Sequence, residues 1–148
     1  MPQSLARVLV HVIFSTKKRE PLIRAGVRPA LDAYLTGTLA NLHCPSLQTG
    51  GTADHVHSLF SLARTRTLAE VVEEVKKSSS RWMKREGVPH FAWQAGYGAF
   101  SVSEPRADVV VRYIAQQEER HRRLTFQEEL RQLLERHGVA YDERYVWD

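Results

Sequence analysis

Two histidines separated by one residue, His55 and His57, have the spacing that most directly suggests chemistry. The run 54–62 predicts a β-strand, and alternate residues of a strand point to the same face, so the two imidazoles should lie side by side. With Asp54 next to them, they can hold a divalent metal and leave coordination positions open for a substrate oxygen. A His-x-His pair also arises by chance on half-exposed strands, so a metal site needs a partner elsewhere in the chain.

A second pair of polar side chains, Tyr113 and Gln117, lies in a helix that we expect from about 107 to about 121. Residues at i and i+4 share one helix face, so the hydroxyl and the amide should project side by side. Val110 and Ile114 would form the neighbouring apolar stripe. Taken alone, Tyr113 could equally be a packed core or boundary side chain, and this alternative stays open.

The elements that must position these side chains alternate between strand and helix. Thr67 and Glu70 form a capping box at the start of one helix, and His11 interrupts an apolar strand as a buried, hydrogen-bonded core histidine. The order βαββαβ predicts an α+β fold, a ferredoxin-like antiparallel sheet with helices packed on one face, plus a C-terminal helix and an aromatic tail. The expected strands span 5–15, 46–49, 54–62 and 91–102, and the expected helices span 28–42, 68–86, 107–121 and 126–136.

Length and composition limit the class of protein. A chain of 148 residues with 43% hydrophobic residues should form one domain, 1–148, with a core over about 1–121 and a C-terminal helix and tail over about 122–148. The single cysteine, Cys44, excludes an internal disulfide framework. No apolar run reaches the roughly 18 residues of a membrane span and no leader is recognisable, so we expect a cytoplasmic protein without membrane contact. The aromatic tail, 141–147, should dock on the domain or on a second copy.

Charge favours a polyanionic partner. The formal net charge is +4 and the sequence pI is about 9.5, although 17 acidic residues offset the 21 basic ones. Each basic cluster, taken singly, could be an ordinary solvated face of a helix or loop. The candidate contacts to nucleic acid are Lys17, Lys18, Arg19, Lys76, Lys77, Arg81 and Lys84.

The His-x-His strand followed by Tyr113 and Gln117 resembles the HUH single-tyrosine transposases. These are small enzymes of bacterial insertion sequences that act on single-stranded DNA, and some relatives associate with repeated palindromes. The resemblance covers nearly the whole chain, with departures at Ala53, where proline is frequent in the family, and at Ser58, where a larger apolar residue is usual. It also rests on the segments 14–17, 79–82, 91–101, 117–119 and 141–143.

The resemblance implies roles for these side chains. His55, His57 and Gln117 would be ligands of Mg²⁺ or Mn²⁺, and Tyr113 would be the nucleophile. A tyrosine hydroxyl, with a pKa near 10, is a poor nucleophile at neutral pH unless the metal makes the phosphate more electrophilic. Attack would give a 5′-phosphotyrosine and a free 3′-hydroxyl, and the reverse attack could join a new end without a nucleotide cofactor.

The resemblance also implies partners. The substrate would be single-stranded DNA that carries an imperfect hairpin near the cleavage site. We expect a homodimer, because two DNA ends must be cut and exchanged, and in the family the tyrosine helix of one subunit can reach the His-x-His strand of the other.

Three rival interpretations remain. The first is a non-catalytic nucleic-acid-binding module, which would present aromatic side chains on an exposed sheet face and ignore metal. A domesticated relative that cuts host palindromes would have the same chemistry as a mobile-element enzyme. A purely structural homodimer with incidental histidines is the third.

Overall fold

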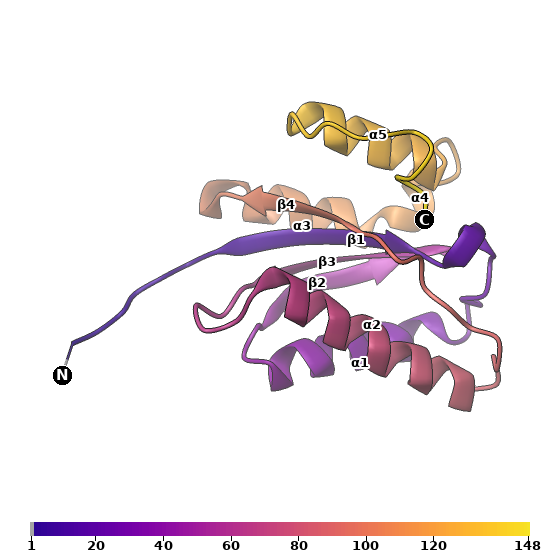
Figure 1. Ribbon diagram of the computed structural model, residues 1–148, viewed down its shortest axis with the longest axis horizontal. Coiled ribbons are helices and arrows are strands. Elements are labelled where there is room, and N and C mark those ends of the chain that lie inside the picture. Colours follow the sequence, from indigo (N-terminus) through magenta and orange to yellow (C-terminus); the bar gives the residue numbers. More distant parts are fainter. Residues whose placement is uncertain (1) are drawn as a thin grey trace.

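A four-stranded antiparallel sheet, with the order β2–β3–β1–β4, forms the centre of the protein (Figure 1). It is seen in a computed structural model that describes residues 2–148. β1 is central and pairs with β3 on one side and β4 on the other. This arrangement confirms the predicted α+β fold. The strands are β1 (Leu9–Ser15), β2 (Ser46–Gly51), β3 (His55–Ser61) and β4 (Gly98–Val102).

Helices α1 (Arg28–Asn41) and α2 (Leu68–Arg85) cover one face of the sheet and enclose the larger hydrophobic core (Figure 1). Alternate residues of the strands point to this side of the sheet and belong to this core, for example Val12 and Val56. The predicted capping box of α2 is confirmed: the Thr67 side chain accepts from the Glu70 backbone, and the Glu70 side chain accepts from the Thr67 backbone.

The opposite face is covered by α3 (Ala107–Ala115) and α5 (Phe126–Arg136) (Figure 1). The other alternate set of strand residues points to this layer, so Ile13 packs with α5 and Leu59 packs with α3. The helix predicted over 107–121 is interrupted. Gln116, with φ −104° and ψ 22°, separates α3 from the short helix α4 (Gln117–Arg120).

The strand predicted over 91–102 was wrong in its first half, because β4 begins only at Gly98. The aromatic residues before it are held by side-chain contacts instead of a sheet ladder. Trp93 forms an isolated bridge with Thr16, and its indole N–H donates to Ser79 Oγ at 2.9 Å. The Lys76 ammonium donates to the carbonyls of residues 94–96, which draws this loop onto α2.

The other boundaries shift less. β1 begins at Leu9 instead of residue 5, and a short 3₁₀ turn, η1 (Lys17–Arg19), follows it. β2 extends through Gly51, so the turn to β3 consists of residues 52–54. A second short turn, η2 (Glu104–Arg106), precedes α3.

Part of the aromatic tail packs on the domain, which is one of the two placements expected from the sequence; the other was packing on a second copy. Trp147 and Tyr141 pack against the α5 cluster, whereas Tyr145 is 64% exposed. Within residues 2–148, no helix is both long enough and apolar enough to cross a membrane.

Candidate active site

The two histidines of β3 face the layer formed by α3 and α5. Both side chains are completely buried, at 0% exposure, and their ring centroids lie 5.2 Å apart. The predicted placement on a single face of the strand is therefore confirmed. Because neighbouring strands and helices exclude solvent from both imidazoles, each ring nitrogen must find a partner inside the protein.

Hydrogen bonds at the Nδ1 atoms orient both rings. His55 Nδ1 donates to Asp54 Oδ1 at 2.7 Å, and His57 Nδ1 shares a hydrogen bond of 2.8 Å with His11 Nε2. His11 is thus the buried, hydrogen-bonded core histidine that the sequence predicted. Partners at Nδ1 leave both Nε2 atoms directed into the site, which is how metal-binding histidines are usually held.

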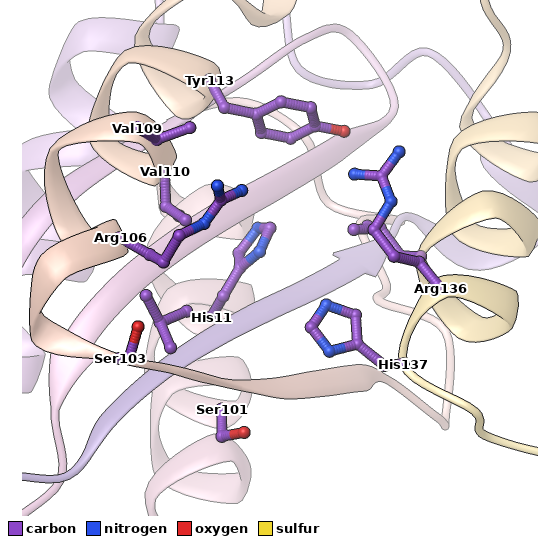
Figure 2. Close-up of a pocket in the computed structure, with 11 residues that line it drawn as sticks. His11, Ser101, Ser103, Arg106, Val109, Val110, Tyr113, Arg136 and His137 are labelled. Atoms are coloured by element: carbon purple, nitrogen blue, oxygen red, sulfur yellow. The ribbon is translucent and has the colours of Figure 1, made fainter.

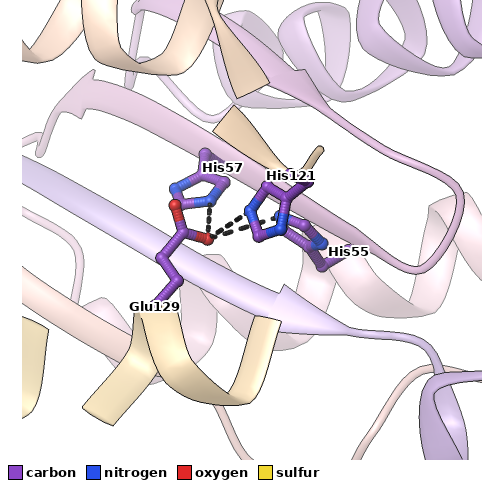
Figure 3. A group of neighbouring side chains, drawn as sticks. All are labelled: His55, His57, His121 and Glu129. Carbon is purple, nitrogen blue, oxygen red and sulfur yellow. Dashed lines mark hydrogen bonds and ion pairs between the residues drawn. The ribbon is translucent and has the colours of Figure 1, made fainter. Parts of the chain in front are cut away.

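A buried carboxylate from α5, that of Glu129, occupies the centre of the site (Figure 3). Its Oε1 atom lies 3.0 Å from His57 Nε2, 3.0 Å from His121 Nε2 and 3.4 Å from His55 Nε2. Neither Glu129 nor His121 is among the site residues predicted from the sequence. Two signals were available: Glu129 interrupts the apolar stripe of α5, and His121 continues the four-residue spacing of Tyr113 and Gln117.

Tyr113, on α3, and Gln117, the first residue of α4, reach the same point. Gln117 Oε1 accepts from His55 Nε2 at 3.0 Å, and its amide nitrogen donates to Glu129 Oε2 at 3.1 Å. The Tyr113 hydroxyl donates a short hydrogen bond to the same carboxylate oxygen. The structure thus brings together the four side chains that the sequence singled out, from β3 on one side and from α3 and α4, more than 50 residues later, on the other.

Burial and the central carboxylate set the charges of the site. Burial is the largest effect on His57 and lowers its pKa to about 4. Burial also lowers the pKa of His55, but hydrogen bonds with Asp54 and Glu129 outweigh it and raise that pKa to about 9. Burial followed by the adjacent Glu129 charge raises the pKa of Tyr113, so the phenol is neutral.

These side chains fit a metal ion. The ligand atoms of His55, His57, His121 and Glu129 all lie within 4.8 Å of one another. Imidazoles combined with one carboxylate suit a first-row transition ion such as Mn²⁺ more readily than Mg²⁺, which prefers oxygen ligands. Gln117 lies at the edge of this group, where its amide oxygen could complete the set.

Gly50, on β2, allows α3 to lie close to the sheet. A Cβ atom placed on Gly50 would lie 2.9 Å from the carbonyl oxygen of Ile114, a separation that real Cβ atoms essentially never show. The backbone of α3 can therefore rest directly on β2 only because residue 50 has no side chain. This contact places Tyr113, one residue before Ile114, beside the histidines.

The predicted basic residues do not gather on one surface. Lys17, Lys18 and Arg19 form the turn after β1, and Arg19 lines an open groove that also includes Asp54 and His121. The other four, Lys76, Lys77, Arg81 and Lys84, lie on α2, on the sheet face away from the site. Among them, Lys76 is engaged with backbone carbonyls, as described above.

Comparisons with known proteins agree with this architecture. The family model described as "Transposase IS200 like" matches residues 4–117. A crystal structure of a Deinococcus radiodurans R1 protein proposed to be a transposase is similar, with a TM-score of 0.63 and 22% identity over 79% of this chain and 98% of the other. A REP-associated tyrosine transposase bound to a REP hairpin gives a TM-score of 0.60 and 13% identity over 82% of this chain and 73% of the other. A comparison with curated proteins gave no match.

The two solved structures, at these low identities, establish the shared fold. The family model covers well over half of the chain and ends at Gln117, so it includes the His-x-His strand and the tyrosine helix. A DNA-processing enzyme of the transposase class is what this family represents. The chain belongs to the IS200-like transposase family.

Proposed function

We propose that this protein cleaves and rejoins single-stranded DNA through a phosphotyrosine intermediate on Tyr113. The observation that carries the proposal is the convergence of the Tyr113 hydroxyl, the His55 and His57 imidazoles and the Gln117 amide around one buried point. A tyrosine that merely packs in a core does not need a ring of metal-binding side chains at its hydroxyl.

In the proposed cleavage step, a bond forms between Tyr113 Oη and the phosphorus, and the bond from phosphorus to the 3′ oxygen breaks. The products are a 5′-phosphotyrosine and a free 3′-hydroxyl. Glu129 Oε2 already accepts a hydrogen bond from the phenol, so it is the nearest acceptor for the proton. Burial raises the pKa of this carboxylate, but the surrounding histidines outweigh burial and hold that pKa well below its usual range, so the transfer depends on a bound metal stabilising the charge that develops. A Mn²⁺ or Mg²⁺ ion held by His55, His57 and Gln117 would supply positive charge to a non-bridging phosphate oxygen.

The buried hydrogen bonds give this site its precision. Asp54 and His11 prevent the two imidazole rings from rotating, so their Nε2 atoms stay directed at the same point. Reversal of the step, with a new 3′-hydroxyl attacking the phosphotyrosine, would return the proton and join two strands without a nucleotide cofactor.

The substrate that we propose is single-stranded DNA with a hairpin near the cleavage point, processed in the cytoplasm. Support comes from the family and from the REP hairpin bound to the similar tyrosine transposase. A domesticated enzyme that acts on host palindromes would use the same residues. A non-catalytic module is disfavoured, because helices cover both faces of the sheet, on which such a module would stack bases.

A denaturing gel tests this proposal. The protein is mixed with Mn²⁺ or Mg²⁺ and single-stranded oligonucleotides that carry a label at the 3′ end, on the strand that would stay attached to Tyr113, and that cover the DNA on both sides of its own gene. We expect a labelled protein band that survives boiling in detergent and requires the divalent ion. If the DNA is cut but the label never stays on the protein, water is the nucleophile and the phosphotyrosine mechanism is wrong.

We also propose a homodimer, because exchange of two DNA ends requires two tyrosines. The single chain already brings Tyr113 beside His57, with ring centroids 5.7 Å apart, so we propose that each site is complete within one chain. Mixed dimers of His57→Ala and Tyr113→Phe chains should then remain inactive, since every site carries a lesion. Restored cleavage would show that the sites are shared between chains, and a DNA-bound monomer by light scattering would reject the dimer.

A further inference from the structure

A second cavity, which we call the strand pocket, opens beside the Tyr113 ring between α3 and α5. Its volume is about 400 Å³. Figure 2 shows Arg106, at the end of η2, and Arg136, at the end of α5, extending their guanidinium groups toward the opening from opposite walls. The Tyr113 ring forms part of the rim, so the strand pocket adjoins the nucleophile.

The lining of the strand pocket carries positive charge. It includes the guanidinium groups of Arg106 and Arg136, and none of the lining residues is acidic. Within residues 2–148, neither guanidinium has a carboxylate partner, and both side chains are exposed. Arginines left unpaired on two sides of a cavity suit an anion with oxygens on more than one side, such as a phosphate.

The rest of the lining suits a nucleoside. Val109 and Leu133 contribute apolar surface, and the His137 ring stacks on Phe100 at a centroid distance of 4.7 Å and an interplanar angle of 27°. This stacking fixes the orientation of the imidazole at the edge of the pocket. A cavity of this size with an apolar wall and a few polar groups is typical of sites for small organic ligands.

We propose that the strand pocket holds the DNA strand that remains attached to Tyr113, with the phosphate after its first nucleotide between Arg106 and Arg136. This inference rests on the proposed function and adds the direction in which the strand leaves the site. Its ligand class is a single-stranded oligonucleotide with a 5′-phosphate.

The direction follows from the geometry of displacement at phosphorus. The attacking phenol oxygen and the departing 3′ oxygen lie on opposite sides of the phosphorus, so the upstream strand leaves on the side away from Tyr113. The 5′ oxygen stays bonded and points sideways from that axis. The strand that continues from the 5′ oxygen is therefore the one that can lie along the tyrosine ring, where the strand pocket is found.

Binding measurements on the full-length Tyr113→Phe chain test the proposal without requiring cleavage. Random-sequence deoxydecanucleotides, with either a 5′-phosphate or a 3′-phosphate and a fluorophore at the other end, are titrated by anisotropy. We expect tighter binding of the 5′-phosphorylated pool. Adding Arg106→Ala and Arg136→Ala together should weaken binding of the 5′-phosphorylated pool roughly tenfold and binding of the 3′-phosphorylated pool much less, because only the 5′-phosphate places the next phosphate between the two guanidinium groups. The preference for the 5′-phosphorylated pool should therefore shrink.

The salt dependence gives a second readout. Losing the contacts to this one phosphate should flatten the slope of log affinity against log salt by about 0.7, the contribution of each neutralised phosphate of a single strand. The matched control removes the same charge elsewhere, through Arg85→Ala with Arg112→Ala. Both residues are exposed, and neither lines a described pocket around the site. Their removal should change affinity little and leave the 5′ preference intact.

The possible results distinguish failure of the strand pocket from failure of Tyr113 as the nucleophile. Equal losses in the Arg106/Arg136 pair and the control pair would reduce the effect to net charge and overturn the strand pocket. A preference for the 3′-phosphorylated pool, lost with Arg106 and Arg136, would overturn the direction. If 5′-phosphorylated DNA binds as expected but no adduct ever forms on the wild-type protein, the proposed nucleophile fails while the strand pocket stands.

Discussion

Replacing Tyr113 by phenylalanine should abolish the covalent protein–DNA adduct and leave the fold and the DNA affinity largely intact. The substitution removes the one oxygen that would form the bond to phosphorus. It also removes a hydrogen bond to Glu129, at a cost of about 1 kcal/mol, because that carboxylate keeps its histidine and glutamine partners. The measurement is the boiled detergent gel, combined with thermal melting and DNA-binding anisotropy on the same preparation.

Tyr97→Phe is the matched control for this experiment. Tyr97 is 40% exposed and lies on the α2 side of the molecule, next to the Lys76 ammonium. This variant should form adduct at the rate of the unmodified protein. An adduct on the Tyr113→Phe chain would end the nucleophile assignment, and its loss on the Tyr97→Phe chain would move the assignment there.

Replacing His55 or His57 by alanine should remove metal-dependent cleavage, with losses of at least about 100-fold, since even residues that only support metal ligands typically contribute 10- to 100-fold. The double variant should be no worse than either single one, because the ligands act as a unit. Calorimetry with Mn²⁺ should show lost binding in all three. Unchanged Mn²⁺ binding in the double variant would show that the metal lies elsewhere or is not bound.

Two further variants make the metal experiment selective. His90→Ala removes an exposed histidine of the loop after α2 that lines neither pocket beside the site, so it should change neither Mn²⁺ binding nor cleavage. Glu129→Gln preserves the shape of the central side chain but removes its charge. If the carboxylate is a metal ligand, this variant should bind Mn²⁺ more weakly. If Mn²⁺ binds as before, Glu129 merely neutralises the histidines in the metal-free protein.

The parts of the fold that were predictable carry their own local signals. The capping box at Thr67 and the apolar stripe beginning at Phe126 define helices without help from the rest of the chain. The loop 91–97 was mistaken for a strand because aromatic residues are typical of strands. Here, Trp93 is placed by a hydrogen bond to Ser79 on α2, a tertiary contact that no local pattern reveals.

The candidate site divides in the same way. His55 and His57 lie within one strand, so strand periodicity was enough to predict that they share a face. Tyr113 ends up beside Gln117 although Gln116 separates α3 from α4, because the four-residue spacing of a helix is nearly kept across the interruption. Glu129 belongs to a further element, and its contact with His57 spans 72 residues of sequence. A charged side chain within an apolar helical stripe indicates that this side chain is buried and has a polar partner. The pattern does not identify the strand or helix that supplies that partner.

The close approach at Gly50 has a consequence for how this fold tolerates change. The contact of the α3 backbone with β2 at Gly50 fixes how close the helix that carries Tyr113 lies to the sheet, whatever the neighbouring side chains are. Many of these side chains can be substituted without changing the distance between α3 and β2, provided that residue 50 stays a glycine. Proteins that are only 13% and 22% identical share this fold, which is compatible with a spacing set by a backbone contact.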